Sequence, residues 1–241
     1  MIQLSEFRNK ELAFLNAERI NPKRGYQIIN SKNYVELQKI LGIQNKEYNS
    51  YVTIATYKKI PRFSLNPKIH WPEFKEWTKT KDQTITSMDF ILDFDSEPTI
   101  KGLKKAWGDV VRAQYVLNLL LGDQAKYLKI WFSGNKGFHI LGKTKVTTNA
   151  QDNINQQLII AQQVKHLCPT LDMTIYDTAR LRKLLGSYVY SKTFGKTRVI
   201  PISNEQEFKE LLIALKTKDE QWFQSKELIR INYINMIGEN K

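Results

Sequence analysis

The segment that most constrains this chain is a mostly apolar run, Met88–Leu92, that leads directly into Asp93, Phe94 and Asp95. Such a run predicts a buried strand. Because side chains alternate between the two faces of a strand, Asp93 and Asp95 point the same way and Phe94 points the other. Two carboxylates on one face repel each other unless a divalent cation lies between them, and Mg²⁺ and Mn²⁺ prefer oxygen ligands. The pair therefore predicts a metal-assisted phosphoryl-transfer site.

Charge and cysteine content narrow the class of protein. The 241 residues include 37 basic and 24 acidic side chains, a net charge of +13. This excess favours polyanionic partners, the plain alternative being a soluble basic protein. A single cysteine, Cys168, excludes an internal disulfide framework and a multi-cysteine zinc site. We therefore expect no zinc and a cytoplasmic location, and the lack of a long apolar run predicts no membrane partner.

The first part of the chain, residues 1–85, is predicted to form an N-terminal α/β lobe. In order, we expect a helix over about 6–15, a turn over 21–25, a helix over 31–41 and a strand over 51–57. The strand is rich in β-branched and aromatic residues. Residues 61–84 contain three prolines and no clean period, which predicts a long surface connection.

From Met88 onward the periodicity is clearer. After the strand that ends at Asp95, a helix is indicated by apolar residues at helical spacing, namely Leu103, Trp107, Val110, Leu117 and Leu121. The expected elements that follow are strands over 127–132 and 138–141, a helix over about 151–167, a short extended piece ending at Asp172 and a strand over 197–202. This order predicts an α+β or α/β chain, with a catalytic lobe over about 86–203 and C-terminal helices over 204–241.

A turn of small and polar residues, Ser133–His139, joins the two predicted strands that follow the helix. Gly134 and Gly137 permit a close approach of the backbone to a phosphate, while Lys136 supplies a positive charge and Ser133 a hydroxyl donor. His139 adds a further donor. Taken alone, the turn is equally well interpreted as a hairpin with a histidine in the core, and the acidic pair favours the phosphate-binding interpretation.

In combination these motifs resemble those of the archaeo-eukaryotic primases. That family has an acidic pair on a strand, then Ser-Gly-x-x-Gly-x-His, then an apolar residue and Asp ahead of a basic helix and Gly-Ser. Leu171-Asp172, followed by Arg180–Ser187, is similar to the third motif. The resemblance implies an RRM-like catalytic antiparallel sheet packed on the N-terminal lobe. It also implies that Asp93, Asp95 and Asp172 are catalytic and hold two divalent ions, Mg²⁺ or Mn²⁺.

The same resemblance implies a set of nucleotide-binding residues. The N-terminal stretches around Glu11 and Arg24 are similar to elements that line the nucleotide site of the small primase subunit. Basic residues after the third motif would neutralise triphosphate charge, although each could also be a solvated charge, which is our interpretation of Arg182. The expected set is Ser133, Gly134, Lys136, His139, Arg180, Lys183, Lys192, Glu11 and Arg24.

Two acids compete for the third catalytic position. Asp172 follows an apolar residue and precedes Ser187 at the family's spacing, so we assign it to the metal. Asp177 is interpreted as the N-cap of the basic helix. The family's histidine after Gly-Ser is absent, which leaves Tyr190 or Lys192 to take its place. The stretch between His139 and Asp172 is also short for a cellular small subunit, and the chain has too few cysteines and histidines for the family's zinc-bound knob. Both features suggest a reduced core, as in primase-polymerases of plasmids, viruses or defence systems.

These observations predict a DNA primase or primase-polymerase that acts on single-stranded DNA template with NTP or dNTP substrates. A large primase subunit or a helicase is a candidate further partner, since the chain offers one evident triphosphate site. The alternatives are an end-joining or repair polymerase of the same superfamily, a non-catalytic nucleic-acid-binding subunit, and a basic α/β module with fortuitous motifs.

Overall fold

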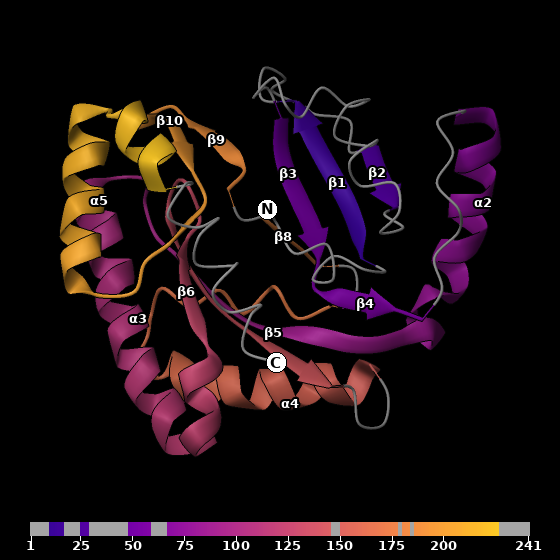
Figure 1. Cartoon of the computed structure of the whole chain (residues 1–241). Helices are drawn as coiled ribbons and strands as arrows, with labels where there is room; N and C mark the ends of the chain where they lie inside the picture. The colour runs from indigo at the N-terminus through magenta and orange to yellow at the C-terminus, as the bar shows by residue number, and fades with distance from the viewer. Residues whose placement is uncertain are drawn as a thin grey trace, which may run out of the picture.

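A computed structural model gives the fold of the chain (Figure 1). The structure describes residues 10–16, 25–28, 48–58, 67–145, 150–177, 180–183 and 186–226. Residues 21–24 of the turn expected over 21–25, with Arg24 among them, and the helix expected over 31–41 lie outside these residues, and the side chain of Glu11 is likewise not described. None of the described helices is long and apolar enough to cross a membrane.

The larger sheet has five antiparallel strands in the order β11-β6-β7-β5-β4. Its middle strand is β7 (Gly137–Lys145), which pairs with β5 (Ile85–Asp95) over nine residue pairs. The other strands are β6 (Lys129–Phe132) and the two edge strands β11 (Ile200–Pro201) and β4 (Ala55–Tyr57). Strand β7 pairs with β6 on its other side.

Two helices cover one face of this sheet, α3 (Ile100–Leu121) and α4 (Ala150–Lys165). Thr99 caps α3, since its side chain accepts a hydrogen bond from the Gly102 backbone N–H. The side chains of Phe90, Leu92 and Phe94 from β5 are buried in one core with residues of both helices and of α5 (Glu205–Thr217). The alternate residues of β5, which include the acids, therefore lie on the opposite face.

A short bridge completes the topology. After α4 the chain returns to β5, where Leu171 forms an isolated antiparallel bridge with Phe94. The order β5, α3, β6, β7, α4 and bridge is the βαββαβ order of an RRM, with the last strand reduced to one residue. The α+β fold with an RRM-like sheet is thus confirmed.

A second sheet of four antiparallel strands lies on the acid-bearing side of β5, in the order β2-β1-β3-β8 (Figure 1). Its members are β1 (Glu11–Asn16), β2 (Gly25–Ile28), β3 (Tyr48–Thr53) and β8 (Leu181–Lys183). A two-stranded hairpin, β9 (Tyr188–Ser191) with β10 (Gly195–Arg198), follows β8.

Four predictions of secondary structure are corrected. The helix expected over 6–15 is strand β1 over its described part, because two neighbouring strands supply backbone partners on both sides. Residues 67–80 of the expected loop form helix α2 (Pro67–Thr80), followed by the 3₁₀ turn η4 (Lys81–Thr84). The expected strand over 51–57 is divided at Ile54 between two sheets. The basic helix expected from Arg180 is strand β8, paired with β3.

Candidate active site

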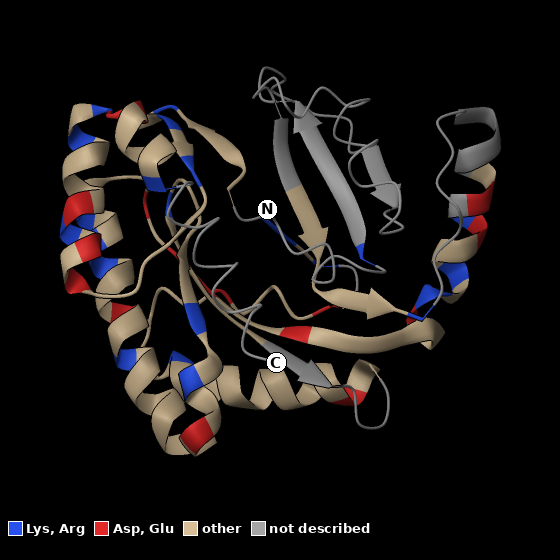
Figure 2. Cartoon of the chain, in the orientation of Figure 1, with Lys and Arg blue, Asp and Glu red and all other residues tan. Residues whose placement is uncertain are grey.

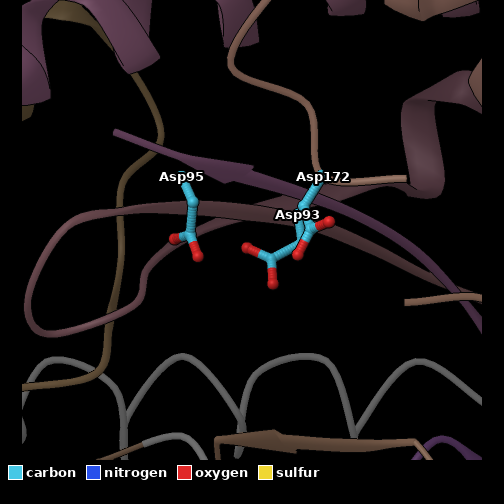
Figure 3. Close-up of side chains that lie close together, drawn as sticks. All are labelled: Asp93, Asp95 and Asp172. Carbon is cyan, nitrogen blue, oxygen red and sulfur yellow. The ribbon is translucent and has the colours of Figure 1, made fainter. Parts of the chain in front are cut away.

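Three aspartates converge at the carboxyl end of β5 (Figure 3). Ligand atoms of Asp93, Asp95 and Asp172 all lie within 4.8 Å of one another. The first two come from β5 and the third from the bridge after α4, and Figure 3 shows the three carboxylates projecting to the same side. The sequence prediction of one shared face for the acidic pair is therefore matched by the geometry.

Backbone hydrogen bonds set the position of the third carboxylate. The Asp172 N–H donates to the Asp93 carbonyl at 2.8 Å, and the Asp95 N–H donates to the Thr170 carbonyl at 2.9 Å. Thr170 is itself held by Asp109 of α3, whose buried carboxylate accepts from the Thr170 N–H and hydroxyl, both at 2.7 Å. These two backbone hydrogen bonds, together with the buried Asp109 carboxylate, thus hold Asp172 beside Asp93 and Asp95.

The turn between β6 and β7 lies next to these carboxylates. Lys136 Nζ is 2.6 Å from Asp95 Oδ2, and His139 Nε2 is 3.3 Å from Asp93 Oδ1. Gly134 has φ +85°, and a Cβ there would lie 2.5 Å from Val189 Cγ2, so both its dihedral angles and its packing require glycine. Gly137 is equally restricted, because a Cβ would lie 1.8 Å from the Phe94 carbonyl oxygen.

Strand β8 and the residue that precedes it bring two more cations to the same place. Arg180 Nη2 lies 3.7 Å from Asp93 Oδ2, and Lys183 Nζ donates to the Ser133 carbonyl at 2.8 Å. Of the predicted nucleotide-binding residues, Ser133, Gly134, Lys136, His139, Arg180 and Lys183 are thus gathered around the aspartates. Lys192 lies exposed in the β9–β10 turn and forms no ion pair with the three aspartates among the described contacts.

The protonation equilibria of the site reflect this crowding. Burial raises the pKa of Asp95 and the charge of Asp93 raises it further, against the opposing effect of Lys136. Burial also acts to raise the pKa of Asp93, but His139, Arg180 and Lys183 outweigh it and lower that pKa. The hydrogen bond to Asp95 raises the pKa of Lys136, whereas burial lowers the pKa of Lys183 to about 8.

Several buried polar atoms around the turn have no hydrogen-bond partner in the described part of the chain. They are Ser133 Oγ, Asn135 Oδ1, His139 Nδ1, Ser187 Oγ and Asp93 Oδ1. Such groups are rare in folded proteins because each costs desolvation energy. Their concentration here indicates a site built to bind polar ligand atoms. Ser187 had been noted only as part of the third motif, and its Gly-Ser context was the available signal.

The assignments of Asp177 and Arg182 are wrong. Asp177 is exposed and caps no helix in the described residues, since the chain continues into strand β8. Arg182 is a half-buried ion-pair partner, with Nε 3.0 Å from Asp89 Oδ2. Lys10 Nζ lies 3.2 Å from the same Asp89 oxygen and also donates to the Thr53 and Ile54 carbonyls. Sequence reasoning missed Asp89, although it lies four residues before Asp93 on the same face of β5.

A scan against protein-family models finds no match, and no curated protein matches the chain. Among solved structures, the polymerase domain of Mycobacterium tuberculosis ligase D in complex with DNA superposes with a TM-score of 0.52 at 12% identity, covering 90% of this chain and 79% of that one. The chain has the archaeo-eukaryotic primase fold.

Two further structures with this primase fold are similar at lower TM-scores. The AEP domain of the cyanophage S-2L primase-polymerase gives 0.47 at 12% identity, covering 84% of this chain and 89% of that domain. Primase RepB′ gives 0.40 at 11% identity, covering 95% of this chain and 63% of that protein. The fold expected from the three motifs is confirmed by the superposition on the ligase D polymerase domain.

Proposed function

We propose that this protein is a metal-dependent nucleotidyltransferase that copies a single-stranded DNA template, as a DNA primase or primase-polymerase. One observation carries the proposal: three carboxylates from two separate segments lie within 4.8 Å of one another, with basic side chains at their edge. Carboxylates gathered without a cation repel each other, so such a cluster favours bound metal. Cations beside it suit the triphosphate of a nucleotide.

The donor set fits Mg²⁺ or Mn²⁺. All ligand atoms in the cluster are carboxylate oxygens, the type that hard divalent ions prefer, and Asp93 Oδ1 is buried without a hydrogen bond. Two ions bound here would supply activation of the attacking 3′-hydroxyl and charge stabilisation at the departing pyrophosphate.

The protein side chains would bind and orient the nucleotide. Lys136 and Arg180 now face Asp95 and Asp93, and with the carboxylate charge neutralised both can hold phosphate oxygens. The raised pKa of Lys136 keeps that ammonium charged at neutral pH. Lys183 fixes the Ser133 carbonyl and therefore the turn, and the Ser133 hydroxyl, which has no partner among the described residues, would donate to a phosphate oxygen.

An end-joining polymerase is the second candidate, because the ligase D polymerase domain shares the fold at the TM-score given above. The two activities differ in whether a strand can be started without a primer. We would incubate the protein with unprimed single-stranded DNA, Mn²⁺ and labelled nucleotides. The matched variants are Asp95→Ala and Asp123→Ala, the latter an exposed acid outside the cluster.

Short products from wild type and Asp123→Ala, but not from Asp95→Ala, are the expected result. Extension of a supplied primer alone, again lost in Asp95→Ala, would favour the end-joining activity. Equal activity in all three proteins, or none on any template, would contradict the proposal and favour a non-catalytic binding subunit.

A further inference from the structure

The β9–β10 hairpin has one face that alternates tyrosines and cations. Tyr188 and Tyr190 are two residues apart on β9 and therefore point to the same side. Their antiparallel partners on β10 are Arg198 and Lys196, respectively, so all four side chains share that face.

These four side chains are in contact. Lys196 Nζ lies 4.8 Å from the centroid of the Tyr188 ring and 5.9 Å from that of Tyr190. The Arg198 guanidinium lies 4.0 Å from the Tyr188 centroid and donates to its hydroxyl. Arg198 is buried, Tyr188 and Lys196 are half-buried, and Tyr190 is 46% exposed. Arg198 thus supports an outer surface made of Tyr188, Tyr190 and Lys196, here called the tyrosine platform.

The other face of the hairpin packs on the Ser133–His139 turn between β6 and β7. Val189 fills the space beside Gly134, and the Thr197 hydroxyl donates to the Gly134 carbonyl. After β10 the chain pairs directly with β6 through Ile200 and Phe132. The tyrosine platform is therefore fixed rigidly to the element that carries Ser133 and Lys136.

The sequence segment that contains the hairpin carries only positively charged side chains. Between Asp177 and Glu205 the sequence contains six basic residues and no acidic one. Figure 2 shows blue and no red on strand β10, while β9 is uncharged. A net positive surface with exposed aromatic rings is the composition that binds single-stranded nucleic acid, with phosphates on the cations and bases stacked on the rings.

We propose that the tyrosine platform binds one strand of single-stranded DNA, with a base stacked on Tyr190 and a flanking phosphate on Lys196. This inference deepens the proposed function and rests on it for the role of that strand as the template. The rigid connection to the Ser133 turn would then keep the strand in a constant relation to the nucleotide site.

The test is fluorescence anisotropy of labelled single-stranded oligothymidylate, titrated with the full chain in EDTA and without nucleotides. Tyr190→Ala is expected to weaken binding by about five-fold or more, the effect of losing one stacked base, while Tyr190→Phe retains the affinity. Lys196→Gln should lower the slope of log affinity against log salt by about 0.7, because one phosphate contact is lost. The matched controls are Tyr115→Ala, an exposed tyrosine on α3, and Lys216→Gln on α5, both expected to bind like wild type.

Equal affinity in Tyr190→Ala and wild type would overturn the inference, as would equal losses in the two tyrosine-to-alanine variants. Unchanged oligonucleotide affinity together with weakened nucleotide binding in Mn²⁺ would overturn it in favour of stacking by the incoming base. The anisotropy assay measures strand binding and needs no catalysis. If the protein shows no nucleotidyltransferase activity but Tyr190→Ala still weakens strand binding, the proposed function is refuted and the tyrosine platform is supported.

Discussion

Asp89 and Asp93 lie four residues apart on the same face of β5, yet their surroundings differ. Asp89 receives two cations, Lys10 and Arg182, and both come from segments that belong to the second sheet or precede it. The three side chains are nearly inaccessible, with exposures of 10%, 4% and 16% in the order Asp89, Lys10 and Arg182. This acid is fully paired within the protein.

At the other end, Asp93 shares its space with two further carboxylates. Its cationic neighbours are more distant, at 3.3 Å for His139 and 3.7 Å for Arg180, and one of its oxygens has no hydrogen bond. The comparison teaches that one strand can use the same residue type to hold two sheets together and, two strand repeats further on, to present charge to a ligand. Internal pairing, rather than burial, separates the two uses.

The largest effect is expected from Asp93→Asn, which keeps the shape of the side chain and removes its charge. Metal-dependent nucleotide transfer should fall by about a thousand-fold or more, because charge stabilisation by bound metal is worth several kcal/mol. Initial rates with Mn²⁺ measure this loss. Retention of more than a tenth of the activity would break the distinction between the two ends of β5.

Asp89→Asn should instead act on stability. Removing the shared partner leaves Lys10 and Arg182 buried without their acid, and breaking a buried pair in this way costs about 3–5 kcal/mol. Urea denaturation measures the change, with Asp123→Asn as an exposed control expected within about 0.5 kcal/mol of wild type. A midpoint equal to that of the control would show that Asp89 does not join the sheets.

Two glycines of β7 sharpen the comparison. Gly137→Ala places a Cβ against the Phe94 backbone beside Asp95, which should cost about 1–3 kcal/mol and reduce activity as well. In Gly142→Ala the Cβ meets only the end of the Leu128 side chain, which can move, so a smaller loss is expected. Thermal denaturation of both variants measures the two losses of stability, and equal losses would contradict this interpretation.

The smallest effect concerns Asp95→Asn without metal. Because the folded pKa of Asp95 is raised, ionisation at neutral pH costs stability, and the variant should be the more stable of the two proteins. As the pH falls through that raised pKa, wild-type Asp95 protonates, and the difference should vanish by the ordinary value of 3.8. Melting curves in EDTA from neutral to acidic pH test the sign, and a less stable variant at neutral pH would contradict it.

Local sequence pattern was sufficient where an element is defined by its own residues. The strand to Asp95, the helix with Leu103 and Trp107, and the strands around the Ser133 turn follow from periodicity and were found within a few residues. The shared face of Asp93 and Asp95 follows from strand alternation alone. The position of Asp172 was found through motif order, since nothing local brings it to β5.

The failures have a common physical origin in distant pairing. Strand β8 was taken for a helix because its partner β3 lies far away in the sequence, and its register with Tyr51, Val52 and Thr53 leaves no local signature. The prolines of α2 favour a loop in the sequence, yet Pro67 occupies the first helical position, where its missing N–H costs nothing, and the helix accommodates Pro72 in its interior. The interpretation of Arg182 as a solvated charge fails for the same reason, because the strand conformation of β8 directs its side chain to Asp89.

The bridge between Phe94 and Leu171 has a consequence for the fidelity of folding. Leu171 is buried in the core beneath β5, and the next side chain, that of Asp172, points the opposite way into the carboxylate cluster. A slip of one residue would exchange them, forcing a charged group among the aromatic rings and a leucine among the oxygens. Because that exchange is costly, the Phe94–Leu171 pair forms in one register. A molecule that completes its core has therefore also completed its set of carboxylates.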